Sequence, residues 1–557
     1  MRSVFLPRLA FSSETRFALG ASVTWALAYN LPFWRQTVSA MWHGSAESTA
    51  FVVSLFAIVV FLQAVLMLLM PSQLFLRIAG SVLFPVAAIT SYFCGAYGVF
   101  MTQDMARNAL ETDAAEVGAL ITTRLIVMVL LLGVLPALLV WLVRLPAISW
   151  TQRLKERAAF FAAAAVVCVV ALLAFSAEYA VFFREHKPIR YTLSPAALVT
   201  SLIGLMDGGR GRASDQPLLA YGGNAIRTWF PRPRPLVLFL VVGETARAEN
   251  FQLGGYARAT NPELGSVENL VYFNASSCAT STALSLPCMF SPFGRNGFDV
   301  DESPRYTNLL DTLVQAGFEV EWRDNNSGCK GVCARVERID YSSRQDPQLC
   351  GDDGCYDEIM LADLEERLGT VRRDTVIVFH QIGSHGPAYS HRYPESFDKF
   401  RPACHSNQLQ ACSEQEVINA YDNTIAYTDY VLARQIDLLR QASSRVDGML
   451  IYVSDHGESL GENGLYLHGI PYSFAPKVQK TVPLLVWMSD AYEKRVGVEN
   501  HCVRAGARQP VSHDNLYHTV LGATGVSNGA YRAQLDILAP CRDPALRSGG
   551  TLAALRD

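Results

Sequence analysis

Long apolar runs in the first third of the chain constrain its fold more than any other feature. A helix that crosses the hydrocarbon core of a bilayer needs about 20 mostly apolar residues. Five runs meet this need, at about 17–34, 50–70, 75–102, 120–145 and 157–183. After residue 183 such runs end, and the chain has the composition of a soluble enzyme. The sequence therefore predicts an α-helical five-span transmembrane domain over residues 1–183, followed by a separate soluble part.

Basic residues near the runs predict the orientation, because positively charged loops stay in the cytoplasm. They gather before the first run and in the loop near 144–157. Five spans and a cytoplasmic N-terminus place the C-terminal part outside. The first run, which Asn30 and Pro32 interrupt, could also be a signal peptide, but it lacks a convincing cleavage site, so an uncleaved anchor is favoured. The basic residues are Arg2, Arg8, Arg16, Arg144, Arg153, Lys155 and Arg157.

Ten of the twelve cysteines lie in the soluble part, and most form close pairs in the sequence. Short-loop disulfides persist in oxidising compartments, which agrees with an external soluble part. A zinc cluster is the rival interpretation, but no C-x-x-C pair occurs. The sequence does not fix the connectivity; local pairing is the simplest choice and leaves the last two together. The pairs are Cys278/Cys288, Cys329/Cys333, Cys350/Cys355 and Cys404/Cys412, followed by Cys502 and Cys541.

The soluble part alternates short apolar runs with helical stretches, which predicts an α/β domain with a mostly parallel sheet. We assign residues 184–234 to a linker with an interfacial helix at Leu193–Met206, and residues 235–557 to this domain. The net charge of −4 gives no case for nucleic-acid binding. Expected strands are Leu236–Val242, Thr375–Phe379, Met449–Val453 and Val482–Trp487; expected helices are Asn308–Ala316, Tyr356–Leu368 and Glu416–Gln441.

Three of these strands run into residues that can bind a metal. Glu244 follows the first strand, His385 lies shortly after the second, and Asp455 with His456 follows the third. His468 comes twelve residues after His456. Ligand-binding residues collect at the carboxyl edge of such sheets. Carboxylates together with imidazoles suit zinc, with manganese less favoured.

A segment rich in hydroxyl residues, 276–290, is the candidate source of a nucleophile. Its serines and threonines are framed by Cys278 and Cys288. A threonine hydroxyl is a weak nucleophile near neutral pH, but a bound cation favours its alkoxide. A disulfide around it would hold it in place for phosphoryl chemistry. The alternative is a Ser/Thr-rich turn that caps a helix.

A polar stripe lies in the loop between the third and fourth runs. Asn108, Thr112 and Glu116 are spaced four apart, so on a helix they share one face. Such a face beside a bilayer could bind an amine-bearing phosphate head group. On spacing alone, a solvated interfacial helix is the favoured interpretation.

Seven ordered motifs give the chain a specific resemblance. It resembles the lipid A phosphoethanolamine transferases, the family of the mobile colistin-resistance enzymes, within the alkaline phosphatase/sulfatase superfamily. The resemblance extends from the first membrane span to about residue 530. The motifs lie at Val242–Phe251, Gly255–Pro262, Cys278–Cys288, Asn326–Val332, His380–Pro387, Ser454–Gly461 and Leu467–Gly469.

The resemblance implies a role for each candidate residue. One or two zinc ions would be held by Glu244, Thr282, Asp455 and His456. Thr282, rather than Thr280, would be the nucleophile that carries phosphoethanolamine, because the family nucleophile lies four residues after the first cysteine of this loop. Lys330, His385 and His468 would contact the transferred phosphate or a second zinc. Asn108, Thr112 and Glu116 match the family's head-group-binding positions. Ala279 stands where the family pattern has Gly, which alters the turn and leaves the chemistry available.

The implied reaction moves phosphoethanolamine from phosphatidylethanolamine to a phosphate of lipid A. The implied enzyme is a monomer in the bacterial inner membrane, with a periplasmic catalytic domain, and its product would weaken polymyxin binding. Transfer of phosphoethanolamine or phosphoglycerol to another glycan or protein is the nearest alternative. A metal-dependent hydrolase and a non-catalytic membrane protein are further alternatives. The loop lacks the Cys/Ser-x-Pro-x-Arg pattern of sulfatases, which argues against sulfate-ester hydrolysis.

Overall fold

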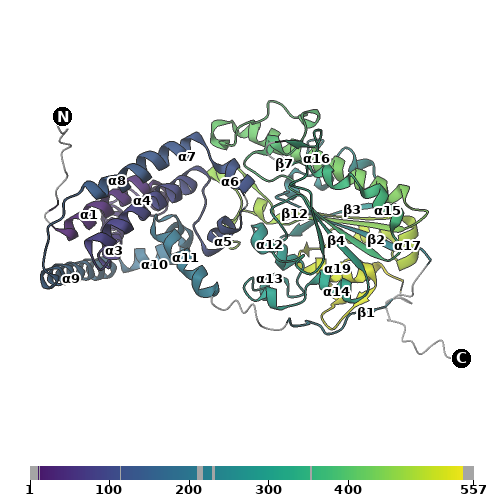
Figure 1. Ribbon diagram of the computed structural model, residues 1–557, viewed down its shortest axis with the longest axis horizontal. Coiled ribbons are helices and arrows are strands. Elements are labelled where there is room, and N and C mark those ends of the chain that lie inside the picture. The colour runs from purple at the N-terminus through teal and green to yellow at the C-terminus, as the bar shows by residue number, and fades with distance from the viewer. Residues whose placement is uncertain are drawn as a thin grey trace. The chain divides into compact units, whose positions relative to one another are not determined.

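The computed structural model forms two compact units. It describes residues 11, 13–112, 114–209, 218–228, 233–351 and 354–543, without the side chains of 114–116 and 207–209. The helical unit comprises Met1–Ala106 and Ile121–Met206, and the α/β unit comprises Arg107–Leu120 and Asp207–Asp557 (Figure 1). The predicted combination of a helical region and an α/β region is confirmed.

Four helical stretches in the described part of the chain are long and apolar enough to cross a membrane. They are α3 (Ala46–Leu68), α4 (Gln73–Ala96), the stretch Thr123–Leu142 and α9 (Trp150–Ala174). They correspond to the last four predicted spans. Shorter helices follow: α10 (Ser176–Glu185), η3 (Lys187–Thr192) and α11 (Ala196–Gly209).

The first predicted span, 17–34, does not form one long helix. It is divided among α1 (Glu14–Thr24), the π-helical turn η1 (Trp25–Tyr29) and α2 (Leu31–Met41). Asn30 lies at the break, where its Nδ2 donates to the carbonyls of Trp25 and Ser194, each at 2.8 Å. Its Oδ1 accepts from the backbone N–H of Ser194 at 2.6 Å. The side chain that interrupts the apolar run is therefore a buried hydrogen-bonding link between distant segments.

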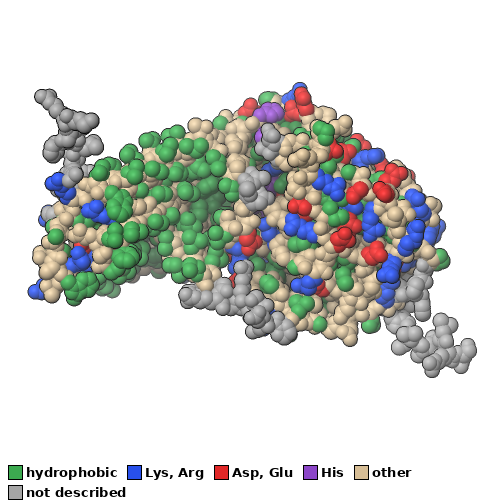
Figure 2. Space-filling model, in the orientation of Figure 1, with side chains coloured by type: hydrophobic (Ala, Val, Ile, Leu, Met, Phe, Trp, Pro, Cys, Tyr) green, Lys and Arg blue, Asp and Glu red, His purple; other side chains and the backbone are tan. Residues whose placement is uncertain are grey.

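The surface of the helical unit is strongly apolar. Hydrophobic side chains gather over it in Figure 2, whereas charged side chains gather over the α/β unit. Leu138 and Leu173 are 61% and 74% exposed, and many other large apolar residues of the long helices are exposed as well. A soluble protein rarely exposes an apolar surface of this extent. The helices thus present to their surroundings a surface suited to lipid.

An eight-stranded mixed sheet forms the centre of the α/β unit. The strand β12 is antiparallel to both of its neighbours, and the other pairings are parallel. The four predicted strands are all present, as β2, β8, β9 and β12. In order across the sheet, the strands are β13 (Val511–Ser512), β3 (Leu270–Ser276), β12 (Thr481–Met488), β9 (Asp447–Ser454), β2 (Leu236–Gly243), β8 (Thr375–His380), β4 (Glu319–Asp324) and β5 (Glu337–Asp340).

Both faces of the sheet are covered, which explains why its central strands read as continuous apolar runs. Along β2, Leu238 and Leu240 enter the core on one face, and Val237 and Phe239 enter the core on the other. The first face is covered by α12 (Thr282–Met289), α14 (Leu309–Gln315) and α19 (Asp514–Thr524) (Figure 1). The second face is covered by α16 (Glu414–Gln441).

Local signals explain where the covering helices begin. Ser413 caps α16 through its Oγ, which accepts from the Glu416 N–H, while the Glu416 carboxylate accepts from the Ser413 N–H. This reciprocal capping box satisfies two otherwise unpaired amides. The predicted helix Tyr356–Leu368 is not continuous: it is a 3₁₀ segment, η8 (Asp357–Leu361), followed by α15 (Leu364–Thr370).

Ten cysteines of the α/β unit form five disulfides, and the other two cysteines, Cys94 and Cys168, are free. Each close pair in the sequence is joined, and the remaining two cysteines join across 39 residues. The disulfides are Cys278–Cys288, Cys329–Cys333, Cys350–Cys355, Cys404–Cys412 and Cys502–Cys541.

Candidate active site

Three adjacent parallel strands, β8, β2 and β9, bring the metal-competent residues to one edge of the sheet. Glu244 follows β2 directly, and Asp455 and His456 follow β9. All three side chains are buried, and each offers a ligand atom within 4.8 Å of the others. The register explains this: Gly243 pairs with Ser454, so the next residue on each strand stands at the same height.

Thr282 joins this group from a different element. It is the first residue of α12, the helix that follows the loop from β3, and its side chain is 6% exposed. Its Oγ1 lies 3.0 Å from Glu244 Oε2 and 3.3 Å from His456 Nε2. Because β3 runs parallel to β9, its carboxyl end delivers this loop to the same edge as Asp455.

The imidazole of His456 is arranged as a ligand. Its Nδ1 lies 3.0 Å from the Gly457 carbonyl, which can only accept, so Nδ1 carries the hydrogen. The lone pair of Nε2 then faces Asp455 Oδ2 at 3.3 Å and Glu244 Oε1 at 3.4 Å. Burial and the neighbouring His468 hold the pKa of His456 well below its usual range. The ring is therefore neutral, as metal binding requires.

The chemistry of these donors fits zinc. Among the described residues, Asp455 Oδ2 is buried without a hydrogen-bond donor, although it lies 3.3 Å from His456 Nε2. Burial raises the pKa of this carboxyl. An unsolvated carboxylate oxygen beside a second carboxylate is costly unless a cation compensates it. Two carboxylates, one neutral imidazole and one hydroxyl form a donor set of the kind that zinc accepts.

Two residues that the sequence interpretation did not assign hold this group in position. Asn326 Nδ2 donates to Glu244 Oε2 at 2.9 Å and to the Gln381 carbonyl at 2.8 Å. His513 Nδ1 accepts from the Cys278 N–H at 3.0 Å, and its Nε2–H donates to the Ser454 carbonyl at 2.9 Å. Asn326 thus orients a carboxylate. His513 links the loop that leads to the candidate nucleophile Thr282 (residues 277–281, here named the nucleophile loop) to the strand end that carries Asp455.

The loop that carries His385 packs tightly on Glu244. Gly383 has a φ of +50°, and a Cβ there would stand 2.8 Å from the Glu244 carbonyl oxygen. The Ser384 N–H donates to the same carbonyl at 3.0 Å. Only glycine adopts this conformation without strain and allows this approach. The motif glycine therefore positions His385 relative to the carboxylate.

His468 and His385 lie beside the carboxylate–imidazole group. The His468 ring centroid is 4.4 Å from that of His456 and 5.7 Å from that of His385. His468 Nδ1 lies 3.4 Å from Glu458 Oε2, and Glu458 is fully buried. The structure thus brings together the predicted residues Glu244, Thr282, Asp455, His456, His385 and His468, with Glu458 as an unassigned neighbour.

Lys330 contacts Ser327 and the backbone of Glu111. Its Nζ donates to Ser327 O and Oγ and to the carbonyl of Glu111, at 3.1–3.2 Å. Segment 107–120 is also held by an ion pair between Arg107 and Asp301 at 2.8 Å. The segment with the predicted head-group residues therefore packs on the α/β unit through Lys330.

Asn108, Thr112 and Glu116 do not lie on one continuous helix, so the expectation that they share one helical face is wrong. The helix α5 (Gln103–Glu111) ends before Thr112, and α6 (Ala114–Leu120) begins after it. Thr112 Oγ1 donates to the Asn108 carbonyl, and Lys330 Nζ donates to the Glu111 carbonyl. Where α5 ends, side-chain donors therefore replace the backbone N–H groups that would continue the helix. The side chain of Glu116 lies outside the described residues.

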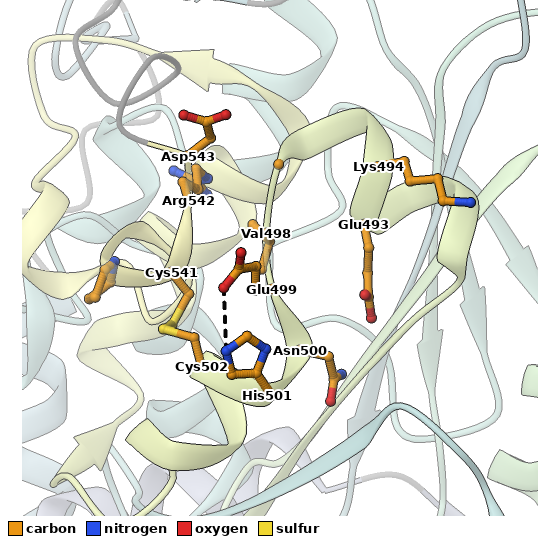
Figure 3. A pocket seen from close by; sticks show the side chains of 12 residues that line it. Glu493, Lys494, Val498, Glu499, Asn500, His501, Cys502, Cys541, Arg542 and Asp543 are labelled. Atoms are coloured by element: carbon orange, nitrogen blue, oxygen red, sulfur yellow. Dashed lines mark ion pairs between the residues drawn. A yellow bond between two sulfur atoms is a disulfide. The ribbon is translucent and has the colours of Figure 1, made fainter.

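A pocket of about 590 Å³ lies elsewhere in the α/β unit. It is open beside the Cys502–Cys541 disulfide, and it contains the exposed pair Glu499 and His501, 3.4 Å apart (Figure 3). None of the predicted catalytic or metal residues lines it. The buried group at the sheet edge is therefore the better candidate for an active site.

Comparisons with known proteins agree with this geometry. Residues 237–526 match the family model described as Sulfatase, and residues 56–208 match the model described as Phosphoethanolamine transferase EptA/EptB. The chain is 38% identical over 523 residues to phosphoethanolamine transferase EptA of Escherichia coli strain K12, covering 93% of this chain and 95% of the relative. It is 40% identical over 423 residues to phosphatidylethanolamine transferase Mcr-1 of Escherichia coli, covering 74% and 77%.

A solved structure resembles nearly the whole chain. It is the integral membrane protein lipooligosaccharide phosphoethanolamine transferase A from Neisseria meningitidis, with a TM-score of 0.92 and 34% sequence identity. The match covers 96% of this chain and 100% of that one. The fold, the sheet-edge group and the sequence relatives lead to one assignment. The chain belongs to the phosphoethanolamine transferase family of the alkaline phosphatase/sulfatase superfamily.

Proposed function

We propose that this protein transfers phosphoethanolamine from phosphatidylethanolamine to a phosphate of lipid A, through a covalent adduct on Thr282. The observation that carries the proposal is the contact of the Thr282 hydroxyl with Glu244 at 3.0 Å and with His456 at 3.3 Å. The relative named phosphatidylethanolamine transferase Mcr-1 supports the choice of donor, and a relative named Kdo(2)-lipid A phosphoethanolamine 7''-transferase, from Escherichia coli strain K12, supports the choice of acceptor.

In the first half of the reaction, Thr282 Oγ1 attacks the donor phosphorus in line. The oxygen–phosphorus bond to Thr282 forms while the bond to diacylglycerol breaks. Glu244, 3.0 Å away, accepts the hydroxyl hydrogen. His468 and His385 lie close enough to the group to stabilise the phosphoryl charge, and one of them supplies a proton to the leaving oxygen.

Zinc bound by Glu244, Asp455, His456 and Thr282 would favour the alkoxide form of the hydroxyl and offset charge on the phosphoryl oxygens. Asn326 contributes by holding the Glu244 carboxylate in one orientation. We propose at least one zinc ion, with His385, His468 and Glu458 as the residues available for a second.

In the second half, a phosphate oxygen of lipid A attacks the phosphorus of the Thr282 adduct. A bond from the acceptor to phosphorus forms, the bond to Thr282 breaks, and Thr282 takes its proton back from Glu244. We assign the ethanolamine end of the donor to Asn108, Thr112 and Glu116, and the transferred phosphate to Lys330. The hydrogen bond from Lys330 to Glu111 and the ion pair between Arg107 and Asp301 support this assignment, because they join the 107–120 segment to the catalytic unit.

We propose that the protein lies in the bacterial inner membrane, as a monomer with a cytoplasmic N-terminus and a periplasmic catalytic domain. We propose α1, η1 and α2 together as a fifth span beside the four long helices. The membrane domain would then be residues 1–183, the linker 184–234 and the catalytic domain 235–557. Five disulfides in the catalytic part support an oxidising compartment. Anchoring confines the enzyme to the plane of its two lipid substrates.

Mass analysis of lipid A from bacteria with and without the protein tests the proposed function. We expect lipid A to gain the mass of phosphoethanolamine only when the protein is present and Thr282 is intact. If lipid A stayed unmodified and the mass increase appeared in another glycan or in a protein, lipid A would not be the acceptor. Release of free phosphoethanolamine alone would show a hydrolase.

A further inference from the structure

Two cationic side chains, Arg295 and Lys480, lie close to the aromatic ring of Tyr472. The guanidinium carbon of Arg295 lies 3.5 Å from the ring centroid of Tyr472. The ammonium nitrogen of Lys480 lies 5.2 Å from the same centroid and donates to the Tyr472 carbonyl at 3.2 Å. Arg295 thus joins two residues of a distant segment, Tyr472 and Lys480, in one basic, aromatic cluster, which we name the Tyr472 cluster.

The positive charge of the Tyr472 cluster is only partly compensated. Within the described residues, neither Arg295 nor Lys480 forms an ion pair. Asp514 is the nearby acid, and its carboxylate accepts from the backbone N–H of Arg295 at 2.7 Å. Burial lowers the pKa of Lys480, and repulsion by the nearby Arg295 charge lowers it further. An anion bound between them would relieve that repulsion.

The cluster is attached to the nucleophile loop at two points. Lys480 accepts at its carbonyl from the Ser277 N–H at 2.8 Å. Near the other end of the same loop, the Gly469 N–H donates to the Thr280 carbonyl at 2.7 Å, and Thr280 Oγ1 donates to the Ile470 carbonyl at 2.6 Å. The segment 469–480 is therefore fastened to both sides of the loop that leads to Thr282. The cluster is thus joined to the loop before Thr282, and its three residues are distinct from those proposed to contact the reacting phosphate.

We propose that Arg295, Lys480 and Tyr472 form an anion subsite for a second phosphate of the acceptor, one that is not itself modified. This inference rests on the proposed function. Two cations beside an aromatic ring suit a phosphomonoester, because both cations can donate to the phosphate while the ring face holds the Arg295 guanidinium in place. Phe474 on the same loop is 40% exposed, which suits an acceptor that is also a lipid.

The acceptor is a better occupant than the donor for a simple chemical reason. A donor phospholipid such as phosphatidylethanolamine has a single phosphate, and that phosphate must lie at Thr282 to react. A separate anion subsite is useful only to a substrate with another anionic group. The Tyr472 cluster would therefore select acceptors with two phosphates and would fix which of them faces the adduct.

The test compares acceptors with one and two phosphates, using the full-length zinc-loaded protein in vesicles. Two otherwise identical acylated disaccharides serve as acceptors. In the double variant Arg295→Gln/Lys480→Gln, we expect the KM for the two-phosphate acceptor to rise about 10-fold or more, as loss of charged hydrogen bonds implies. The KM for the one-phosphate acceptor and the rate of diacylglycerol release should not change.

Two further variants separate binding from folding. Arg295→Lys with Lys480→Arg keeps both charges and should keep most of the affinity for the two-phosphate acceptor. Lys477→Gln removes an exposed charge from the same loop and should have no effect. Equal losses with both acceptors would overturn the proposal, as would slower diacylglycerol release. The proposal would also be overturned if the double variant lost affinity for the two-phosphate acceptor only in vesicles with anionic lipids and not in neutral vesicles. The cluster would then bind the bilayer. A wild-type protein that modifies neither acceptor would instead refute the proposed function.

Discussion

The hydroxyl of Thr282 lies 3.0 Å from the carboxylate of Glu244, although 38 residues separate the two in the sequence. Glu244 directly follows one strand, and Thr282 begins a helix after the end of another. The sheet brings both to one edge, where Asp455 and His456 complete the group. The proposed chemistry depends on this convergence.

Substitutions at Thr282 separate the hydroxyl from the shape of the side chain. Thr282→Val keeps the branched shape, so the protein should fold and melt within a few degrees of wild type, but transfer should fall to background. Thr282→Ser keeps the hydroxyl and should retain transfer at a rate reduced about 10- to 100-fold, because placement of the nucleophile is less restricted. Lipid A mass analysis and thermal melting measure the two effects. Transfer by the valine variant would remove Thr282 from the mechanism.

Asn326→Ala should weaken zinc binding without removing a ligand. Its amide orients the Glu244 carboxylate at 2.9 Å, and loss of such support costs about 10- to 100-fold in metal affinity. Competition with a chelator measures the affinity. Asn296→Ala, at an exposed position, is the matched control. Equal zinc affinity in both variants would contradict the role given to Asn326.

The Cys278–Cys288 disulfide should affect catalysis as well as stability. Replacing both cysteines by serine removes a cross-link over 10 residues, worth about 3 kcal/mol of unfolding free energy. The same change at Cys404 and Cys412 removes a cross-link over 8 residues and a similar free energy. At a temperature where both variants are folded, only the first should lose transfer activity, by about 10-fold or more, because only its loop holds Thr282. Equal activities would show that the first disulfide has no role in placing Thr282.

His513 should make the protein sensitive to acid. Burial lowers its pKa to about 4, and both ring nitrogens are hydrogen-bonded in the neutral form. The unfolded ring takes up a proton near pH 6.5. Stability is therefore fully present above about pH 6.5 and is lost as the pH falls toward 4, by roughly 3 kcal/mol in total.

Melting temperatures between pH 7.5 and 4 test this assignment. Wild type should lose more stability over this range than His513→Asn, which has no titrating ring at that position. His501→Asn, which changes an exposed histidine, should behave like wild type. The comparison uses the pH slope, so a uniform loss of stability in the variant does not affect it. Identical slopes in His513→Asn and wild type would contradict the assignment.

The sequence predicted the strands that carry ligands because they are buried on both faces and read as continuous apolar runs. It did not predict β4, in which Glu321, Arg323 and Asp324 are buried. Arg323 forms an ion pair with Glu321 at 2.6 Å, so charges that look solvent-exposed in the sequence are paired inside the fold. Nor did it predict β3, whose carboxyl end delivers the nucleophile loop.

The supporting residues depend on which strands are neighbours, and the local pattern does not contain that information. His513 contacts Cys278 across 235 residues. Asn326 follows β4, and its contact with Glu244 follows from the order β2-β8-β4. Likewise, the contact in which Lys330 donates to the Glu111 carbonyl joins residues 219 positions apart. The motifs therefore predicted side chains that the structure brings together, and the fold shows which residues hold them.

Mass analysis of the Thr282 peptide is the most direct test of the covalent intermediate. The purified, zinc-loaded protein is incubated with phosphatidylethanolamine in the absence of acceptor and then digested. We expect the peptide to gain the mass of one phosphoethanolamine group at Thr282, and to lose it when lipid A is added. Full transfer activity with no adduct on Thr282, or with the adduct on another residue, would contradict the account.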